Sequence, residues 1–154
     1  IMSSDWSSDV CSSDLCNGFQ VLCEAGLLPG ALTRNAHLRF VCRDVPLTVE
    51  ATDTAWTGRY APGQTIVIPA KHGEGRYVAD LSTLQQLEDE GRVVVRYAYG
   101  SNPNGSEHDI AGVTNPGRNV VGLMPHPEHA VDPGLIGGTD GRGFFDSVLA
   151  GLPV

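Results

Sequence analysis

At residues 119–128 the chain reads Asn-Val-Val-Gly-Leu-Met-Pro-His-Pro-Glu. The first six residues are mostly apolar and β-prone, which predicts a short buried strand. Two prolines then end the strand, because each lacks an N–H group and restricts the residue before it. His126 and Glu128 follow at its carboxyl end, where the two-residue period of an extended chain would aim both side chains the same way. A carboxylate beside an imidazole fixes the tautomer of the imidazole. The pair therefore predicts a general base, which would act by taking a proton from a nucleophile.

The best-matched nucleophile is a cysteine in the run Cys-Asn-Gly-Phe-Gln at residues 16–20. The apolar residues that follow Cys16 predict a short helix over residues 17–25. A thiol just before a helix N-terminus is favoured as the thiolate, and the free N–H groups there can donate to an oxyanion. Taken alone, a cysteine is more often a buried structural thiol, and His126 with Glu128 is as often a solvated loop pair.

The composition indicates one acidic domain of 154 residues. A hydrophobic content of 41% is near the globular average, and no apolar stretch is long enough to span a membrane. The net charge of −8 argues against binding to nucleic acid. The four cysteines lack a CxxC pair, and the run from His126 to His129 lacks the i, i+4 spacing of a zinc helix, so no metal site is expected. The amino terminus carries no secretory signal, which indicates a cytoplasmic protein with free thiols.

Residues 1–14 differ in composition from the rest of the chain. The triplet Ser-Ser-Asp recurs there, and this low-complexity segment holds too few apolar residues to pack. We interpret residues 1–14 as a non-native or disordered segment and residues 15–154 as a partial domain. A natural disordered tail is the alternative for the first segment.

The rest of the domain alternates predicted strands and helices. Residues 71–77, Lys-His-Gly-Glu-Gly-Arg-Tyr, form a turn with two glycines that can line a site. Three acids at residues 88–90 fall at the end of a helix, where they oppose its dipole. The expected strands cover residues 38–50, 65–69, 92–97, 110–113 and 120–124, the last two as a hairpin, and the expected helices cover residues 82–91 and 144–152.

Three motifs, at residues 16–20, 72–75 and 124–129, resemble in this order those of the class I (triad-type) glutamine amidotransferases. Within that family they are most similar to the glutaminase subunits of phosphoribosylformylglycinamidine synthase, an enzyme of de novo purine synthesis. The resemblance covers residues 15–154. It implies an α/β fold with a flavodoxin-like, doubly wound sheet that lacks its N-terminal strands, and a site at the carboxyl ends of the strands.

The resemblance implies a role for each residue of these motifs. Cys16 would attack the side-chain amide of glutamine and form a thioester, while His126 would transfer protons and Glu128 would orient His126. The released ammonia would serve the conversion of formylglycinamide ribonucleotide to formylglycinamidine ribonucleotide. The further implied site residues are the backbone N–H of Asn17 as an oxyanion donor and, near the bound glutamine, Gln20, His72 and Glu74.

The implied partners are glutamine, a large synthetase subunit that uses ATP and Mg²⁺, and a small accessory subunit. No cofactor is expected in this subunit, and neither nucleic acid nor a membrane is an expected partner. In the family a buried strand precedes the cysteine, with a glycine two residues before it; here that position is Asp14, and we expect no strand. We therefore expect a truncated, impaired glutaminase. The alternatives are a non-catalytic fragment that docks to the synthetase and a cysteine peptidase-like hydrolase.

Overall fold

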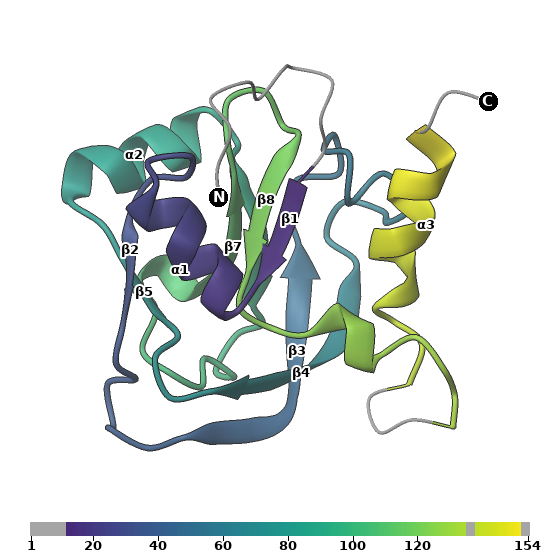
Figure 1. The fold of residues 1–154 in the computed structure, drawn as a ribbon, viewed down its shortest axis with the longest axis horizontal. Coiled ribbons are helices and arrows are strands. Elements are labelled where there is room, and N and C mark those ends of the chain that lie inside the picture. Colours follow the sequence, from purple (N-terminus) through teal and green to yellow (C-terminus); the bar gives the residue numbers. More distant parts are fainter. Residues whose placement is uncertain (1–11, 135–137, 152–154) are drawn as a thin grey trace.

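The computed structural model describes residues 12–134 and 138–151, which form a curled sheet with helices on its two faces (Figure 1). The strands of this sheet are β1 (Ser12–Leu15), β3 (Val41–Val49), β4 (Thr65–His72), β6 (Val93–Tyr97), β7 (Ile110–Thr114) and β8 (Val120–Leu123). They lie in the order β1, β8, β7, β6, β3, β4. Among the described strands only β1 and β8 pair in parallel, and the other neighbours in the sheet are antiparallel.

Shorter elements and helices complete this part of the chain. Two strands, β2 (Ala31–Thr33) and β5 (Arg76–Val78), form a separate small sheet. The helices are α1 (Asn17–Glu24), α2 (Leu81–Asp89) and α3 (Arg142–Gly151), with short 3-10 turns η1 (Glu107–Asp109) and η2 (Pro127–His129). In Figure 1, α1 and α2 lie on one side of the sheet and α3 on the other. No helix within the described ranges is long and apolar enough to cross a membrane.

Two apolar clusters lie on the two faces of the sheet, because successive residues of a strand point to opposite sides. In β8, Val120 belongs to the cluster that includes Phe19 of α1, while Val121 belongs to the opposite cluster. Phe144 of α3 closes that second cluster and packs edge-on against Tyr60, with ring centroids 5.1 Å apart. The sheet is therefore covered on both faces, which fixes the positions of α1 and α3 beside it.

Most of the predicted elements are confirmed. The helix predicted at residues 17–25 is α1, the helix predicted at residues 82–91 is α2, and the closing helix is α3. The hairpin predicted before His126 is formed by β7 and β8. The α/β fold class is confirmed, although most of the ladders described here are antiparallel.

The prediction that no strand precedes Cys16 was wrong. Residues 12–15 form β1, and Leu15 lies opposite Leu123 of β8 in the ladder. The serines and aspartate of β1 have little intrinsic β-propensity, but pairing with β8 supplies the hydrogen bonds that propensity does not predict. The end of the segment that we interpreted as non-native thus belongs to the sheet, and residues 1–11 of that segment lie outside the described residues.

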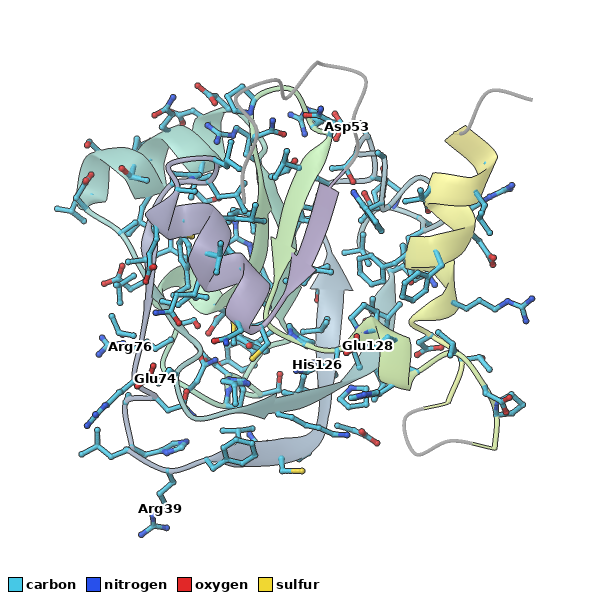
Figure 2. All side chains as sticks on the ribbon, viewed as in Figure 1. Arg39, Asp53, Glu74, Arg76, His126 and Glu128 are labelled. Atoms are coloured by element: carbon cyan, nitrogen blue, oxygen red, sulfur yellow. The ribbon has the colours of Figure 1, made fainter. Side chains whose placement is uncertain are left out.

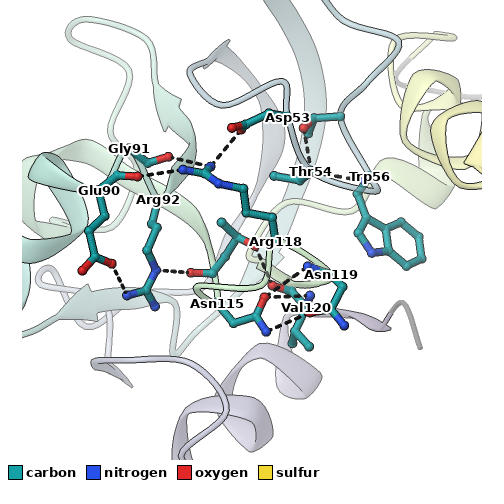
Figure 3. A network of polar contacts seen from close by, with 12 residues as sticks. Asp53, Thr54, Trp56, Glu90, Gly91, Arg92, Asn115, Arg118, Asn119 and Val120 are labelled. Atoms are coloured by element: carbon teal, nitrogen blue, oxygen red, sulfur yellow. Dashed lines mark hydrogen bonds and ion pairs between the residues drawn. The ribbon is translucent and has the colours of Figure 1, made fainter. Parts of the chain in front are cut away.

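A polar network ties the turn between β7 and β8 to the end of α2 (Figure 3). Arg118 donates to the carbonyl oxygens of Glu90 at 2.7 Å and Gly91 at 3.0 Å. The same guanidinium donates to Oδ1 of Asp53 at 2.8 Å. Arg92 donates to Oε2 of Glu90 at 3.0 Å. These cations offset the acids at the helix end, and they fix the hairpin that leads into the candidate site.

Candidate active site

Cys16 occupies the sharp turn between β1 and α1. Its backbone has φ 52° and ψ −101°, a left-handed conformation that residues with a side chain rarely adopt. Its N–H donates to the carbonyl oxygen of Leu123 at 2.8 Å, so Cys16 lies where β1 and β8 both end. Asn17 begins α1 directly after it, and the N–H of Asn17 is one of the unpaired donors of a helix N-terminus. The turn therefore presents the thiol beside these donors, as the sequence predicts.

Replacing Cys16 with glycine is expected to stabilise the fold relative to Cys16→Ala. Glycine adopts a φ of 52° without strain, whereas alanine keeps the Cβ that strains this turn. The difference in the free energy of unfolding should be about 1–2 kcal/mol, measured by urea denaturation. Equal stabilities of the two variants would show that the turn stores no strain.

His126 and Glu128 meet through the 3-10 turn η2, and not through the extended period that we expected. The N–H of His126 donates to the carbonyl oxygen of Pro69 in β4 at 2.8 Å, which holds the segment after β8. The turn then brings Oε1 of Glu128 to 2.6 Å from Nδ1 of His126. A carboxylate only accepts, so Nδ1 carries the proton and Nε2 is the basic nitrogen. Nε2 is buried and has no hydrogen-bond partner among the described residues.

The Cys16 thiol lies against His126 and close to β4, where its sulfur is 3.8 Å from the carbonyl oxygen of Lys71. The Cys16 side chain is the main cause that raises the pKa of His126 to about 9, and Glu128 raises it further against the effect of burial. An imidazole with so high a pKa can take the proton of the thiol and leave a thiolate. The three side chains can therefore attack a carbonyl carbon and transfer protons during the attack.

The sequence of the chain matches a known family. Residues 7–135 match the CobB/CobQ-like glutamine amidotransferase domain. The chain belongs to this family. Family membership agrees with the α/β fold.

Relatives of this glutamine amidotransferase domain carry a common name. The phosphoribosylformylglycinamidine synthase subunit PurQ of Frankia casuarinae is 66% identical over 138 residues, which cover 90% of this chain and 59% of the relative. PurQ of Rubrobacter xylanophilus is 61% identical over 140 residues, covering 91% of this chain and 62% of the relative. The structure of PurLQS from Thermotoga maritima matches with a TM-score of 0.77 and 46% identity, over 90% of this chain and 60% of that chain. The chain thus spans less than two thirds of the length of these relatives.

Two residues predicted near the bound glutamine make other contacts in this amidotransferase structure. The side-chain amide of Gln20 donates to Glu24, one turn further along α1, at 3.1 Å. Glu74 is exposed and pairs with Arg34 at 3.5 Å. Figure 2 shows Glu74 well apart from His126 in that view. The structure therefore does not bring Gln20 or Glu74 into contact with the catalytic candidates.

His72, the third of these residues, is buried at the end of β4 in a polar network that sequence patterns did not reveal. Nδ2 of Asn104 donates to Nε2 of His72 at 2.8 Å, and Nδ2 of Asn35 donates to the His72 carbonyl oxygen at 2.9 Å. Burial, followed by the charges of His126 and His37, lowers the pKa of His72 to about 4. His72 is therefore a neutral, firmly held ring next to the site. Asn35 and Asn104 gave no sequence signal beyond turn-forming composition.

We expect the stability of the domain to fall as the pH drops from about 6.5 to about 4. Over this range the unfolded chain binds a proton at His72 that the folded domain does not, so protonation favours unfolding. The folded domain keeps His126 protonated over this range, because its pKa is raised to about 9, while the unfolded chain gains at most about half a proton at His126 below the ordinary value of 6.5, so the contribution of His126 is small. Urea denaturation at each pH should show a loss on the order of 2 kcal/mol. His72→Gln, whose amide oxygen can accept from Asn104, should flatten this slope, and an unchanged slope would contradict the assignment to His72.

Ligand atoms of His126, Glu128 and His129 lie within 4.8 Å of one another, a grouping that can hold a metal ion. The sequence spacing led us to expect no metal, and this stays a prediction. Oε1 of Glu128 is already bonded to Nδ1 of His126, so a metal ion at these atoms would compete with that hydrogen bond.

Proposed function

We propose that this chain is the glutaminase portion of phosphoribosylformylglycinamidine synthase and that it hydrolyses glutamine through a thioester on Cys16. The observation that carries the proposal is the meeting of three side chains from distant parts of the sequence. Cys16 comes from the turn after β1, and His126 and Glu128 follow β8. The PurQ names of relatives with 66% and 61% identity support this choice among amidotransferases.

In the proposed reaction His126 first takes the thiol proton on Nε2. The sulfur of Cys16 then adds to the side-chain amide carbon of glutamine, and the oxyanion accepts a hydrogen bond from the N–H of Asn17. As the carbon–nitrogen bond breaks, the imidazolium gives its proton to the leaving nitrogen, so ammonia departs and a thioester remains. Water, deprotonated by His126, adds to the thioester and releases glutamate, and the thiolate regains a proton. Glu128 holds the tautomer of His126 throughout.

We propose that Gln20, His72 and Glu74 lie beside the bound glutamine. His72 already stands close to His126, and the charge of His126 affects its pKa. Gln20 and Glu74 are held in the resting chain by contacts with Glu24 and with the exposed Arg34. Exposed contacts of this kind contribute little stability, so bound glutamine can replace them at small cost.

The proposed product, ammonia, requires a second protein that consumes it. We propose a large synthetase subunit that uses ATP and Mg²⁺ to convert formylglycinamide ribonucleotide to formylglycinamidine ribonucleotide, together with a small accessory subunit. The similarity to a structure named PurLQS supports an assembly of this kind. We propose that the chain works in the cytoplasm and holds no cofactor of its own.

The test of this function is alkylation by a diazo-ketone analogue of glutamine, with the labelled site identified by mass spectrometry. We expect selective labelling of Cys16. Cys23 and Cys42 are internal controls, since burial raises the pKa of Cys23 to about 12 and Cys42 is an exposed thiol. Equal labelling of the three, or none at Cys16, would overturn the catalytic proposal and favour a non-catalytic docking fragment. Cleavage of a peptide without hydrolysis of glutamine would favour a peptidase-like hydrolase.

A further inference from the structure

His129, the last residue of η2, lies against the catalytic pair. Its ring stacks on the ring of His126, with centroids 5.3 Å apart and an interplanar angle of 16°. Its Nε2 lies 3.9 Å from Oε1 of Glu128, the same oxygen that accepts from His126. His129 is therefore placed to act on both members of the pair.

Lys71 of β4 determines which nitrogen of His129 carries the proton. Its Nζ lies 3.3 Å from Nδ1 of His129. An ammonium group only donates hydrogen bonds, so Nδ1 of His129 is the acceptor and the proton of the neutral ring sits on Nε2. Nε2 is the nitrogen near Glu128, so Lys71 places an N–H group of His129 on the side of that carboxylate.

We propose that His129, in the tautomer set by Lys71, is a positioning residue that keeps the Glu128 carboxylate on His126. Hydrogen bonding holds this carboxylate at Oε1 alone, because Oε2 is buried with no hydrogen-bond partner among the described residues. At 3.9 Å from Oε1 the N–H of His129 is beyond hydrogen-bond distance, and it acts on the carboxylate by electrostatic attraction. The ring stack limits how far His126 can turn away. For its effect on catalysis the inference rests on the proposed glutaminase function.

The side chains around His129 come from several elements of the fold. Within the described chain, Lys71 is the residue whose side chain hydrogen-bonds to the ring of His129. The other charged or titratable groups around the site include His72 on β4, the Arg142–Asp146 pair on α3 at 3.6 Å, His126 and Glu128 beside η2, and Cys16 before α1. The neighbouring strand β3 adds Cys42, Arg43 and Asp44 beside Lys71.

The first test measures the His126–Glu128 hydrogen bond in the resting chain, through NMR of the His126 Nδ1 proton. In His129→Ala this proton should exchange with water about ten-fold faster, because the ring stack and the electrostatic contact that hold the pair in place are lost. The amide of His129→Gln can present an N–H group to Glu128 and should restore slow exchange. Lys71→Met, which keeps the backbone carbonyl beside Cys16 but frees the tautomer, should give an intermediate rate. Arg43→Met, which removes the same charge from the neighbouring strand β3, should not change it.

The second test measures kcat and KM for glutamine hydrolysis in the same variants. His129→Ala should lower kcat by about ten-fold, since small displacements of catalytic groups cost up to roughly a hundred-fold in rate. KM should change little, because His129 orients the pair and is not placed at the glutamine. His129→Gln should recover most of kcat, and Arg43→Met should leave both constants unchanged.

The outcomes separate this inference from the function on which it rests. If the wild-type chain does not hydrolyse glutamine, the proposed function fails, and proton exchange alone then decides the role of His129. Wild-type exchange in His129→Ala would overturn the inference. Faster exchange in a folded His129→Gln, equal to that of His129→Ala, would show a packing role and would also overturn it.

Discussion

His126→Asn is expected to lower the rate of Cys16 alkylation by the glutamine analogue, and any glutamine hydrolysis, by about 10²–10⁴-fold. Asparagine cannot take the thiol proton, so the thiolate loses both its base and its cationic partner. The Cys16 side chain is the main cause that raises the pKa of His126, so the thiol and the imidazole interact in the wild-type chain. Labelling rates at neutral pH, followed by intact mass, measure the effect without requiring a partner protein.

His108→Asn is the matched control for this prediction. His108 is half-exposed and pairs with Glu88 at 3.0 Å. It has a φ of 51°, a conformation that asparagine tolerates, so the fold should not suffer. The control should label Cys16 at the wild-type rate. A His126→Asn chain that labels as fast as the control would mean that Cys16 reacts without a base, and the proposed mechanism would fail.

The meeting of Cys16 with His126 and Glu128 was predictable because each motif carries a local signal. A cysteine before an apolar helix and a strand that ends in Pro-His-Pro-Glu place both groups at the carboxyl ends of strands. The resemblance to amidotransferases then joins motifs that lie far apart in the sequence. Glu128 contacts His126 as predicted, but the 3-10 turn η2, and not an extended strand, brings the two side chains together.

Features that depend on tertiary pairing were not predictable from local patterns. β1 exists because β8 lies beside it, and its own serines and aspartate favour other conformations. The contacts of Glu74 depend on where Arg34 lies, and no sequence period records that distance. The position of His129 depends on a 3-10 turn and on Lys71 of another strand. Residues that carry the chemistry of a site can be predicted from motifs in one sequence, whereas the side chains that surround the site cannot.

Gly122→Ala is expected to destabilise the domain by about 3 kcal/mol, the upper range for overpacking in a core. A Cβ on this residue of β8 would overlap the ring of Phe19 and lie 2.7 Å from Cδ1 of Leu28. Phe19 is fully buried in α1, so relief requires that α1 move away from the sheet. Because Cys16 directly precedes α1, the same shift should reduce selective labelling of the thiol. Urea denaturation and the alkylation rate measure the two effects.

Gly58→Ala is the control that measures the general cost in stability of replacing a glycine without a steric overlap. A Cβ there meets no atom closer than 3.9 Å, so its stability should stay within about 0.5 kcal/mol of the wild type. A double-mutant cycle with Phe19→Val then identifies the clash, because valine lacks the ring atoms that the new Cβ would overlap. Gly122→Ala should cost clearly less in that background. If it costs the same with and without the Phe19 ring, the close packing of α1 on β8 is not what requires glycine at this position.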